Sequence, residues 1–466
     1  MKRDFFKMNR VEIHVDANKR RAEFEGWRHS LGCGGINSMP LPERVVQGVA
    51  RLKPRLVRVF IQEYFNVYPS KGTFDWGRLD PYLESVARTG AKVLATVNLK
   101  PPTLFPEKSQ SAWRPLNIQE YQELIYRLAK RYSAEKAIIT HWEHVNEPDI
   151  GETGGCPFLL TTAKENYEMY RMMIEPILKA APSAKVGGPA LANVFSPIME
   201  GFIRLCYENN TPLDFVSWHC YHDDLDVFLK GIEHVRNCLK IYGDRQPELM
   251  INEMNKGFEF VSDPKGAFDL LSVEEMAYQP RRAAILTRNI LGMEEAGVDW
   301  THYYHIWDGS IQAEEFGRFF SERGVKEVMY KHWNEAPLRF GLFSPNTTVR
   351  PQYFVYWILS RIRGEKVETA CSDKDLTALA VAGQNKTSVL LVNLNEDKVV
   401  QAAFTGLKPG LRRLKLYRID EEKRWDGEKL ELLPLEERDV YVLEEFSCQC
   451  FSPQDSVVWL VLEEVK

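Results

Sequence analysis

Eight short runs rich in valine, isoleucine and aromatic residues alternate with amphipathic stretches along this 466-residue sequence, and this alternation constrains the fold most. The runs cover residues 31–37, 56–60, 92–98, 138–146, 185–191, 215–221, 248–252 and 298–307. Between most of them lie helical patterns, such as residues 80–88, 118–132 and 166–180. Strands separated by helices favour parallel pairing, and eight such units favour an α/β fold of the closed (β/α)₈ type, here expected over residues 29–364.

A doubly wound open sheet is the alternative fold. Such sheets usually carry a G-x-G-x-x-G phosphate loop after an early strand. The nearest glycine cluster, Gly32-Cys33-Gly34-Gly35, lacks that spacing. The closed barrel is therefore the better prediction.

The two ends of the chain show β-structure without helical periodicity. From about residue 365 onward, alternating runs at 376–381, 388–393, 412–417, 440–443 and 456–462 are separated by turn residues such as Lys408-Pro409-Gly410. This pattern is typical of a β-sandwich, which we predict over residues 365–466. Residues 11–16 and 21–24 predict a short hairpin around Ala17-Asn18-Lys19. Because this N-terminal segment, residues 1–28, lies outside the barrel, we expect it to join the sandwich.

Composition narrows the class of partner. The formal net charge of −5 is small for a chain of this size, so nothing indicates nucleic acid or an anionic membrane as a partner. The sequence lacks an 18-residue apolar stretch, and residues 1–10 do not resemble a secretory signal. The eight cysteines are scattered and include no C-x-x-C pair. We expect a cytoplasmic protein with reduced thiols and no cofactor, and we leave a homo-oligomer open.

Two glutamates stand where predicted strands give way to loops. Glu147 follows the fourth run and Glu253 follows the seventh. Barrel active sites lie at the carboxyl ends of the strands, so both carboxylates can face one substrate across the mouth. Hydrolysis of a glycosidic bond with retention needs two carboxyls about 5–5.5 Å apart, one to protonate the leaving oxygen and one to attack the anomeric carbon. This paired placement outweighs the alternative that each is a solvated loop residue among 65 acidic ones.

Three H-x-x-H pairs also occur, and they raise the question of a metal site. A spacing of three places both rings on one face of a helix, but on opposite faces of a strand. All three pairs lie on predicted strands, so we predict no metal site. The pairs are His141/His144, His219/His222 and His302/His305.

Several segments resemble glycoside hydrolase family 39, the β-xylosidase and α-L-iduronidase family, which belongs to the barrel clan with paired glutamates on strands four and seven. They are Asn146-Glu147-Pro148, Val57-Arg58, Gly72-Thr73-Phe74-Asp75-Trp76 with Leu79-Asp80, Val186-Gly187-Gly188-Pro189, Phe215-Val216-Ser217-Trp218-His219-Cys220-Tyr221, Ile251-Asn252-Glu253-Met254-Asn255 and Arg350-Pro351-Gln352-Tyr353. The resemblance spans roughly residues 30–360. It implies a retaining glycosidase in which Glu147 is the general acid/base and Glu253 is the nucleophile.

The sequence departs from the family pattern at three places. Phe60 occupies a strand-two position that is usually histidine, and Asn252 and Met254 replace the threonine and phenylalanine that flank the nucleophile in the xylosidase type. An insert at residues 151–156 follows the acid/base and resembles a flexible rim loop. Each departure bears on the identity of the substrate rather than on the class of reaction.

The resemblance implies roles for five further residues, all as candidates for substrate binding. Asn146 would hydrogen-bond the sugar 2-hydroxyl, and His219 would touch the sugar. Arg58 would hold the nucleophile's carboxylate and keep it ionised, and Tyr221 would donate a hydrogen bond to it. Trp307 would stack on a sugar face. Core packing is the alternative role for Arg58, His219, Tyr221 and Trp307.

The leading hypothesis is therefore an exo-acting glycosidase on small β-linked oligosaccharides, with xylosides as the leading substrates. An iduronidase-like enzyme is an alternative, in which Lys256 could face a substrate carboxylate, and another exo- or endo-glycosidase of the family is also open. A carbohydrate-binding protein with an inactive barrel is the alternative from a different class. The presence of both Glu147 and Glu253 counts against that alternative.

Overall fold

The structure is a computed structural model that describes residues 9–26, 29–34, 38–257, 278–309, 313–328, 340–422 and 425–465. The chain forms two compact units, which we describe separately. One consists of Arg28–Val273 and Glu295–Thr347, and the other of Met1–Trp27, Glu274–Glu294 and Thr348–Lys466.

The first unit contains a closed barrel of eight parallel strands, which confirms the predicted fold class. The strands are β2 (Ser30–Gly32), β3 (Leu56–Gln62), β4 (Lys92–Asn98), β5 (Ile139–Glu143), β6 (Lys185–Leu191), β7 (Phe215–Tyr221), β8 (Glu248–Asn255) and β9 (Trp300–Tyr304). β2 pairs with β9, at Ser30 and His302, which closes the barrel. The first strand is shorter than expected, and residues 35–37 of that prediction lie outside the described part of the chain.

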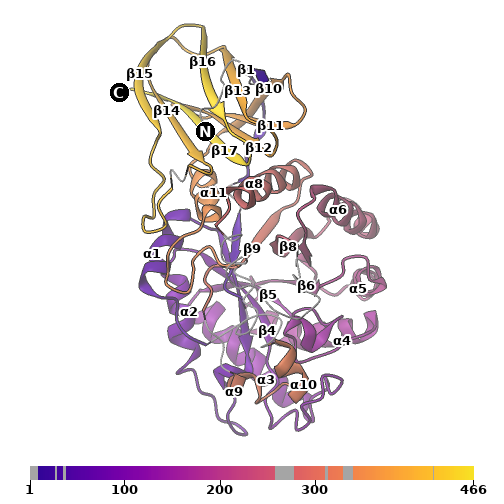
Figure 1. The fold of residues 1–466 in the computed structure, drawn as a ribbon. Helices are drawn as coiled ribbons and strands as arrows, with labels where there is room; N and C mark the ends of the chain where they lie inside the picture. Colours follow the sequence, from indigo (N-terminus) through magenta and orange to yellow (C-terminus); the bar gives the residue numbers. More distant parts are fainter. Residues whose placement is uncertain are drawn as a thin grey trace, which may run out of the picture. The chain divides into compact units, whose positions relative to one another are not determined.

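Helices follow most of these strands and surround them (Figure 1). They are α1 (Glu43–Leu52), α2 (Leu79–Ala87), α3 (Ile118–Ala129), α4 (Ala163–Ala180), α5 (Pro197–Glu208), α6 (Leu225–Leu239), α9 (Ala313–Phe316) and α10 (Glu322–Val328). Local sequence fixes several helix starts. Thr162 and Glu165 form a capping box at α4, and Ser196 caps α5 with Pro197 in its first turn.

Burial of the barrel strands determines where polar groups can lie. Every residue of β3 is buried, as expected for a parallel strand covered on both faces. An apolar cluster of Leu56, Leu94, Phe215, Met250 and Trp300 fills the part of the barrel near the strand starts. Buried polar side chains such as Arg58 and Glu143 follow toward the carboxyl ends, where barrel active sites are formed.

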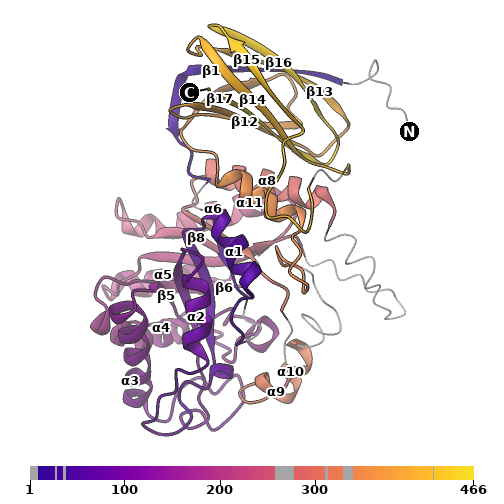
Figure 2. The ribbon, with the colours of Figure 1, turned by 90° about the vertical axis from the view of Figure 1, so that its left-hand side faces the viewer.

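The second unit contains a nine-stranded sheet that builds the predicted β-sandwich (Figure 2). Its order is β15-β14-β17-β12-β11-β10-β1-β13-β16. The strands are β1 (Asn9–Glu23), β10 (Glu365–Cys371), β11 (Leu376–Ala382), β12 (Lys386–Asn393), β13 (Lys398–Thr405), β14 (Gly410–Ile419), β15 (Glu436–Val442), β16 (Glu445–Ser452) and β17 (Ser456–Glu464). Only two residue pairs join β10 to β11, and side chains from both sides of that junction share one apolar core.

The N-terminal segment joins this sheet, but the predicted hairpin is wrong. Asn9–Glu23 is a single strand that pairs in parallel with β13 and antiparallel with β10. The polar residues expected to form a turn continue the strand, because irregular pairing with β10 between Asp16 and Glu23 accommodates them without a reversal of the chain.

Two helices that lie outside residues 365–466 belong to the sandwich unit, whose C-terminal part therefore begins at Thr348 instead of residue 365 and which also includes Glu274–Glu294. They are α8 (Pro280–Glu295) and α11 (Pro351–Leu359). The N-terminal division, after Trp27, falls within one residue of the expected one. Trp357 of α11 packs against Trp459 and Tyr417, with ring centroids 6.1 and 5.8 Å apart, so aromatic packing holds α11 on the sheet.

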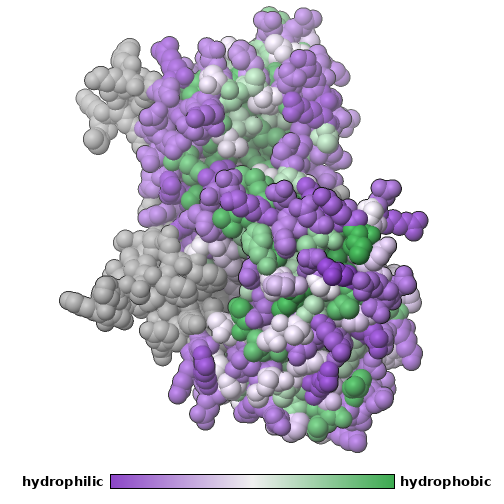
Figure 3. Space-filling view, turned by 90° about the vertical axis from the view of Figure 1, so that its right-hand side faces the viewer, coloured by the Kyte–Doolittle hydropathy of each residue, from purple (hydrophilic) through white to green (hydrophobic). Residues whose placement is uncertain are grey.

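The described helices include none that is both long and apolar enough to cross a membrane. On the face of the molecule drawn in Figure 3, apolar residues lie in patches interrupted by hydrophilic ones.

Candidate active site

Glu147 lies in a tight turn just beyond β5. The strand ends at Glu143, three residues earlier than predicted. Glu147 has a left-handed backbone, with φ of 40°, a conformation that costs about 1–3 kcal/mol and persists only where the surrounding contacts enforce it. Its N–H donates to the carbonyl of Ala190 at 2.9 Å, and its own carbonyl accepts from the N–H groups of Ile150 and Gly151. These bonds hold the turn and direct the side chain toward the barrel mouth.

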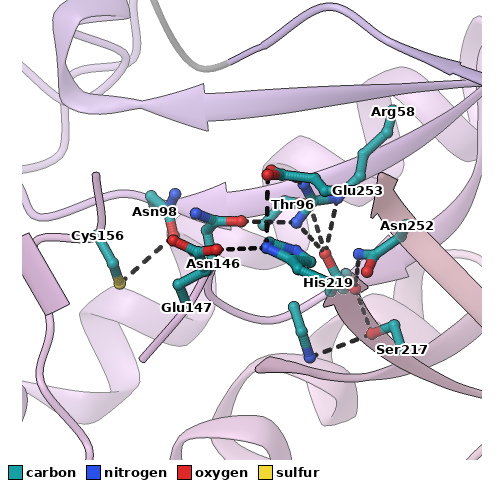
Figure 4. A network of polar contacts seen from close by, with 12 residues as sticks. Arg58, Thr96, Asn98, Asn146, Glu147, Cys156, Ser217, His219, Asn252 and Glu253 are labelled. Carbon is teal, nitrogen blue, oxygen red and sulfur yellow. Dashed lines mark hydrogen bonds and ion pairs between the residues drawn. The ribbon is translucent and has the colours of Figure 1, made fainter. Parts of the chain in front are cut away.

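Glu253 lies inside β8, which continues to Asn255 instead of ending at the predicted residue 252. The pairing of β8 with β7 shifts between Ile251 and Glu253, so Asn252 is an extra residue in the ladder. Neighbouring residues of a regular strand face opposite sides, and a bulge re-aims one of them. Both Asn252 and Glu253 consequently reach one buried polar network (Figure 4).

His219 of β7 lies between the two glutamates (Figure 4). A hydrogen bond of 2.6 Å joins its Nδ1 to Oε1 of Glu147, and Nδ1 is 3.4 Å from Oε2 of Glu253. One carboxylate oxygen of each glutamate and a ring nitrogen of His219 lie within 4.8 Å of one another. The structure therefore brings the two sequence-predicted carboxylates together, with a histidine that was expected to touch the sugar between them.

Arg58 of β3 lies behind Glu253 and is completely buried. Its Nη1 donates to Oε1 of Glu253 at 2.6 Å, and its Nη2 donates to Oδ1 of Asn146 at 2.9 Å. Tyr221 donates its hydroxyl to Oε2 of Glu253 at 2.5 Å. Arg58 and Tyr221 thus make the contacts expected of them, although Arg58 lies too deep to touch a substrate and acts on the carboxylate instead.

Sequence reasoning missed Glu143, the fully buried carboxylate that holds Arg58. Its Oε2 accepts from Nε and Nη2 of Arg58 at 3.0 and 2.7 Å. The Glu143 carboxylate also accepts hydrogen bonds from the side chains of Thr96, Ser217 and Asn252, at 2.7, 2.5 and 2.6 Å. A charged residue inside an otherwise buried strand was the signal available in the sequence, because such residues are almost never buried without a partner.

Burial raises the pKa of both catalytic candidates, but their neighbours differ. For Glu147, burial and then the charge of Asp149 raise the pKa to about 8, with Arg58 opposing. For Glu253, burial raises the pKa while His219, Arg58 and the Tyr221 hydroxyl lower it. Since an arginine contacts Glu253 and the described residues place no lysine or arginine against Glu147, Glu253 is the first of the two to ionise.

Glu147, His219 and Glu253 are the one group in the described part of the chain with three potential metal ligands close together. Burial lowers the pKa of His219 to about 4, so its ring is neutral and chemically able to coordinate. The guanidinium of Arg58, 2.6 Å from Glu253, repels a cation at this position. The arrangement favours acid–base and nucleophilic chemistry by the two carboxyls over metal binding.

The remaining candidates lie around this centre. Asn146 donates its Nδ2 to the carbonyl of Gly154 at 2.9 Å, so its amide is held on both sides. Trp307 is half-buried beyond β9, with its indole N–H 3.5 Å from the Pro345 carbonyl, and the described contacts do not link it to the carboxylates. Tyr304, which sequence reasoning missed, ends β9 with its ring 6.1 Å from that of Tyr221.

A closed barrel with two facing glutamates at its mouth and a buried arginine behind one of them is an arrangement typical of barrel glycosidases. A profile of the family described as glycosyl hydrolases family 39 matches residues 74–241. A β-xylosidase from Caldicellulosiruptor saccharolyticus is 22% identical over 347 residues, which cover 70% of this chain and 64% of that protein. The matched region is thus less than two thirds of that relative.

Two solved structures share the fold. A monomeric β-xylosidase from Caulobacter crescentus CB15 has a TM-score of 0.76 and 16% identity, with 98% of this chain and 100% of that chain covered. A bacterial orthologue of human α-L-iduronidase has a TM-score of 0.74 and 16% identity, with 98% and 84% covered. Together with the profile match, these findings confirm the resemblance to glycosyl hydrolases family 39.

Proposed function

We propose that the chain is a retaining, exo-acting glycosidase that cleaves small β-linked oligosaccharides, with β-xylosides as the leading substrates. The observation that carries this proposal is the closeness of the Glu147 and Glu253 carboxylates, within 4.8 Å at their nearest oxygens. Inverting enzymes need about 6.5–9.5 Å to place a water between the sugar and the base. The site is too narrow for that arrangement and suits direct attack by a carboxylate.

The first step uses the different charges of the two carboxyls. Glu147, protonated at neutral pH, gives its proton to the leaving oxygen as the bond from that oxygen to the anomeric carbon breaks. An oxygen of the Glu253 carboxylate forms a new bond to the same carbon, which yields a glycosyl ester and releases the alcohol. Arg58 and Tyr221 hold the Glu253 carboxylate in place until it attacks.

The second step reverses the roles. The Glu147 carboxylate, left by the first step, takes a proton from water, and the hydroxide oxygen bonds to the anomeric carbon. The ester bond breaks, Glu253 returns as a carboxylate, and Glu147 is again protonated. Two inversions at one carbon retain its configuration.

The names of the similar proteins support xylosides as the first substrates to test. One feature favours a uronic acid as a second candidate. The ammonium of Lys256 lies 5.8 Å from the centroid of Phe340, and that ring stacks on Tyr221, which bonds Glu253. A cation linked to the nucleophile through these two rings could pair with a substrate carboxylate.

A cytoplasmic setting is also our proposal. All eight cysteines are free thiols in the structure, which supports a reducing compartment.

A panel of aryl glycosides tests the substrate class. We expect turnover of aryl β-xylosides, and turnover of aryl uronides instead would support the second candidate. An inactive panel, with no binding of xylose or xylobiose either, would overturn the proposed function; binding without turnover would favour the inactive-barrel alternative.

Covalent trapping tests the mechanism. A 2-fluoro glycoside with an activated leaving group should accumulate as an ester on the peptide that contains Glu253. Glu253→Gln should abolish labelling, whereas Glu123→Gln, on the exposed face of α3, should label as the parent does. Glu147→Ala should slow substrates with poor leaving groups by roughly 10²–10⁴-fold, and azide should rescue its second step. A label on another carboxylate contradicts the assignment.

A further inference from the structure

The insert after the acid/base is an ordered turn against the catalytic pair. We call residues 151–155 the acid/base loop. It contains the 3₁₀ turn η5 (Gly151–Gly154), followed by Gly155 in a left-handed conformation. The N–H of Gly155 donates to the Glu152 carbonyl, and that of Cys156 donates to the Gly151 carbonyl, both at 3.1 Å. The loop expected to be a flexible rim therefore has internal hydrogen bonds of its own.

Gly154 contacts both members of the catalytic dipeptide. Its carbonyl accepts from Nδ2 of Asn146 at 2.9 Å. A methyl group added to its Cα would fall on Oε2 of Glu147, so only glycine fits beside this carboxyl. The other oxygen of Glu147 bonds His219. The Glu147 carboxyl is consequently enclosed between His219 and the acid/base loop, and its side chain is 12% exposed.

A buried carboxylate fastens this loop to the opposite side of the mouth. Glu152, 5% exposed, accepts from the N–H of Ser321 at 2.7 Å and from its hydroxyl at 2.5 Å. Ser321 precedes α10 and also accepts from the N–H of Gly324 at 3.0 Å. The backbone N–H of Glu152 donates to Oε1 of Gln110 at 2.8 Å. The loop is thus tied to segments that follow β4 and β9.

Resting on the proposed function, we infer that the acid/base loop, fastened by Glu152 to Ser321, positions Asn146 and Glu147 and keeps water from the Glu147 carboxyl. Glu152 and Gly154 are positioning residues, because they act through the dipeptide and not on the substrate. The side-chain amide of Asn146 accepts a hydrogen bond from Arg58 at Oδ1 and donates one N–H of Nδ2 to the Gly154 carbonyl. Its second N–H can therefore donate to a sugar hydroxyl.

Removal of the contact between Glu152 and Ser321 should change the pKa of Glu147. Burial is the largest cause that raises the Glu147 pKa to about 8, so access of water should lower it. The charged and titratable groups around Glu147 stay in place in such a variant. Asp149 raises its pKa, Arg58 lowers it, His219 contacts it, and Glu253, Tyr221, Tyr304 and Cys156 lie near enough to interact with it.

The test compares Glu152→Ala, Ser321→Ala and their double variant with a matched control. Glu322→Ala removes an exposed carboxylate from the first turn of α10 and should leave the loop intact. One readout is the alkaline limb of kcat/KM on an aryl glycoside. The other is the carboxyl titration of ¹³C-labelled Glu147 by NMR, which needs no turnover.

We expect the alkaline limb and the NMR titration of Glu152→Ala to move down together by about one pH unit or more. Ser321→Ala should move both less, and the double variant should match Glu152→Ala, because the two residues form one contact. Substrates with poor leaving groups should lose more rate than activated ones. Gly154→Ala should show the same leaving-group dependence, while Gly317→Ala, where a methyl group meets atoms only at 3.4 Å or more, should not.

An active parent with unchanged alkaline limb and unchanged NMR titration in Glu152→Ala and Ser321→Ala would overturn the inference and leave the proposed function standing. A parent that turns over no glycoside would instead remove the proposed function. In that case the NMR titration still decides whether the loop sets the pKa of Glu147.

Discussion

Arg58→Met should destabilise the barrel in a strongly pH-dependent way. The change removes the cation from Glu143, which is fully buried and keeps only neutral donors. A buried carboxylate without a cation takes up a proton, and the cost is bounded by the free energy of protonation from its ordinary pKa of 4.5. That cost is about 1.4 kcal/mol at pH 5.5, about 3.4 kcal/mol at pH 7 and about 4.8 kcal/mol at pH 8.

The direction of this pH dependence follows from the linkage between proton binding and folding. In the variant the folded-state pKa of Glu143 lies above its unfolded value, so stability is retained below pH 4.5 and lost as the pH rises. Denaturant unfolding of parent and variant at pH 5.5, 7 and 8 measures the difference. The double variant Arg58→Met/Glu143→Gln should recover most of the pH-dependent loss yet remain inactive, because Glu253 still lacks its cation.

Arg131→Met is the matched control. Arg131 also pairs with a carboxylate, Asp80, but both side chains are partly exposed, so its loss should cost about 1 kcal/mol or less and vary little with pH. A cost for Arg58→Met that is equal at pH 5.5 and pH 8 would refute the reasoning, as would a double variant no more stable than the single one at pH 8.

Three further outcomes are expected. Tyr221→Phe removes the 2.5 Å hydrogen bond to Glu253 and should lower kcat by roughly 10–100-fold, the worth of a hydrogen bond to a charged group; an unchanged kcat contradicts its role. Asp149→Asn should move the alkaline limb of kcat/KM to lower pH, because the charge of Asp149 raises the Glu147 pKa; an upward or absent shift contradicts this. Because burial lowers the pKa of His144 to about 4, unfolding midpoints should fall as the pH drops from 6.5 toward 4, and a flat profile would contradict the lowered pKa of His144 in the folded protein.

The sequence allowed the barrel and its two catalytic candidates to be predicted, because their signals are local. Strand-forming runs recur at barrel spacing, and each glutamate directly follows such a run in the sequence. The exact residues at which strands end were harder to predict from the sequence. β8 continues past residue 252 because a bulge at Asn252 keeps it paired with β7, and a bulge leaves no clear mark in a single sequence.

Features that depend on distant contacts were not predictable. Glu152 and Ser321 are 169 residues apart, so nothing near the insert indicates that it is fastened across the mouth. Glu143 likewise depends on Arg58, 85 residues earlier. In the sandwich, β13 and β16 were missed because their residues do not alternate cleanly between apolar and polar types. They acquire their place by pairing with each other, and β13 also pairs with β1.

The buried charges also explain how one site can run both steps. With Glu147 protonated, Arg58 offsets one of the carboxylates Glu143 and Glu253, so the cluster carries one net negative charge. The Glu147 carboxylate raises the pKa of Glu253, and because an interaction energy belongs to the pair, Glu253 must affect Glu147 equally. Formation of the glycosyl ester removes the Glu253 charge, so the pKa of Glu147 falls when it has to act as a base. This coupling therefore contributes to the difference between the acid form and the base form of Glu147 in the proposed mechanism.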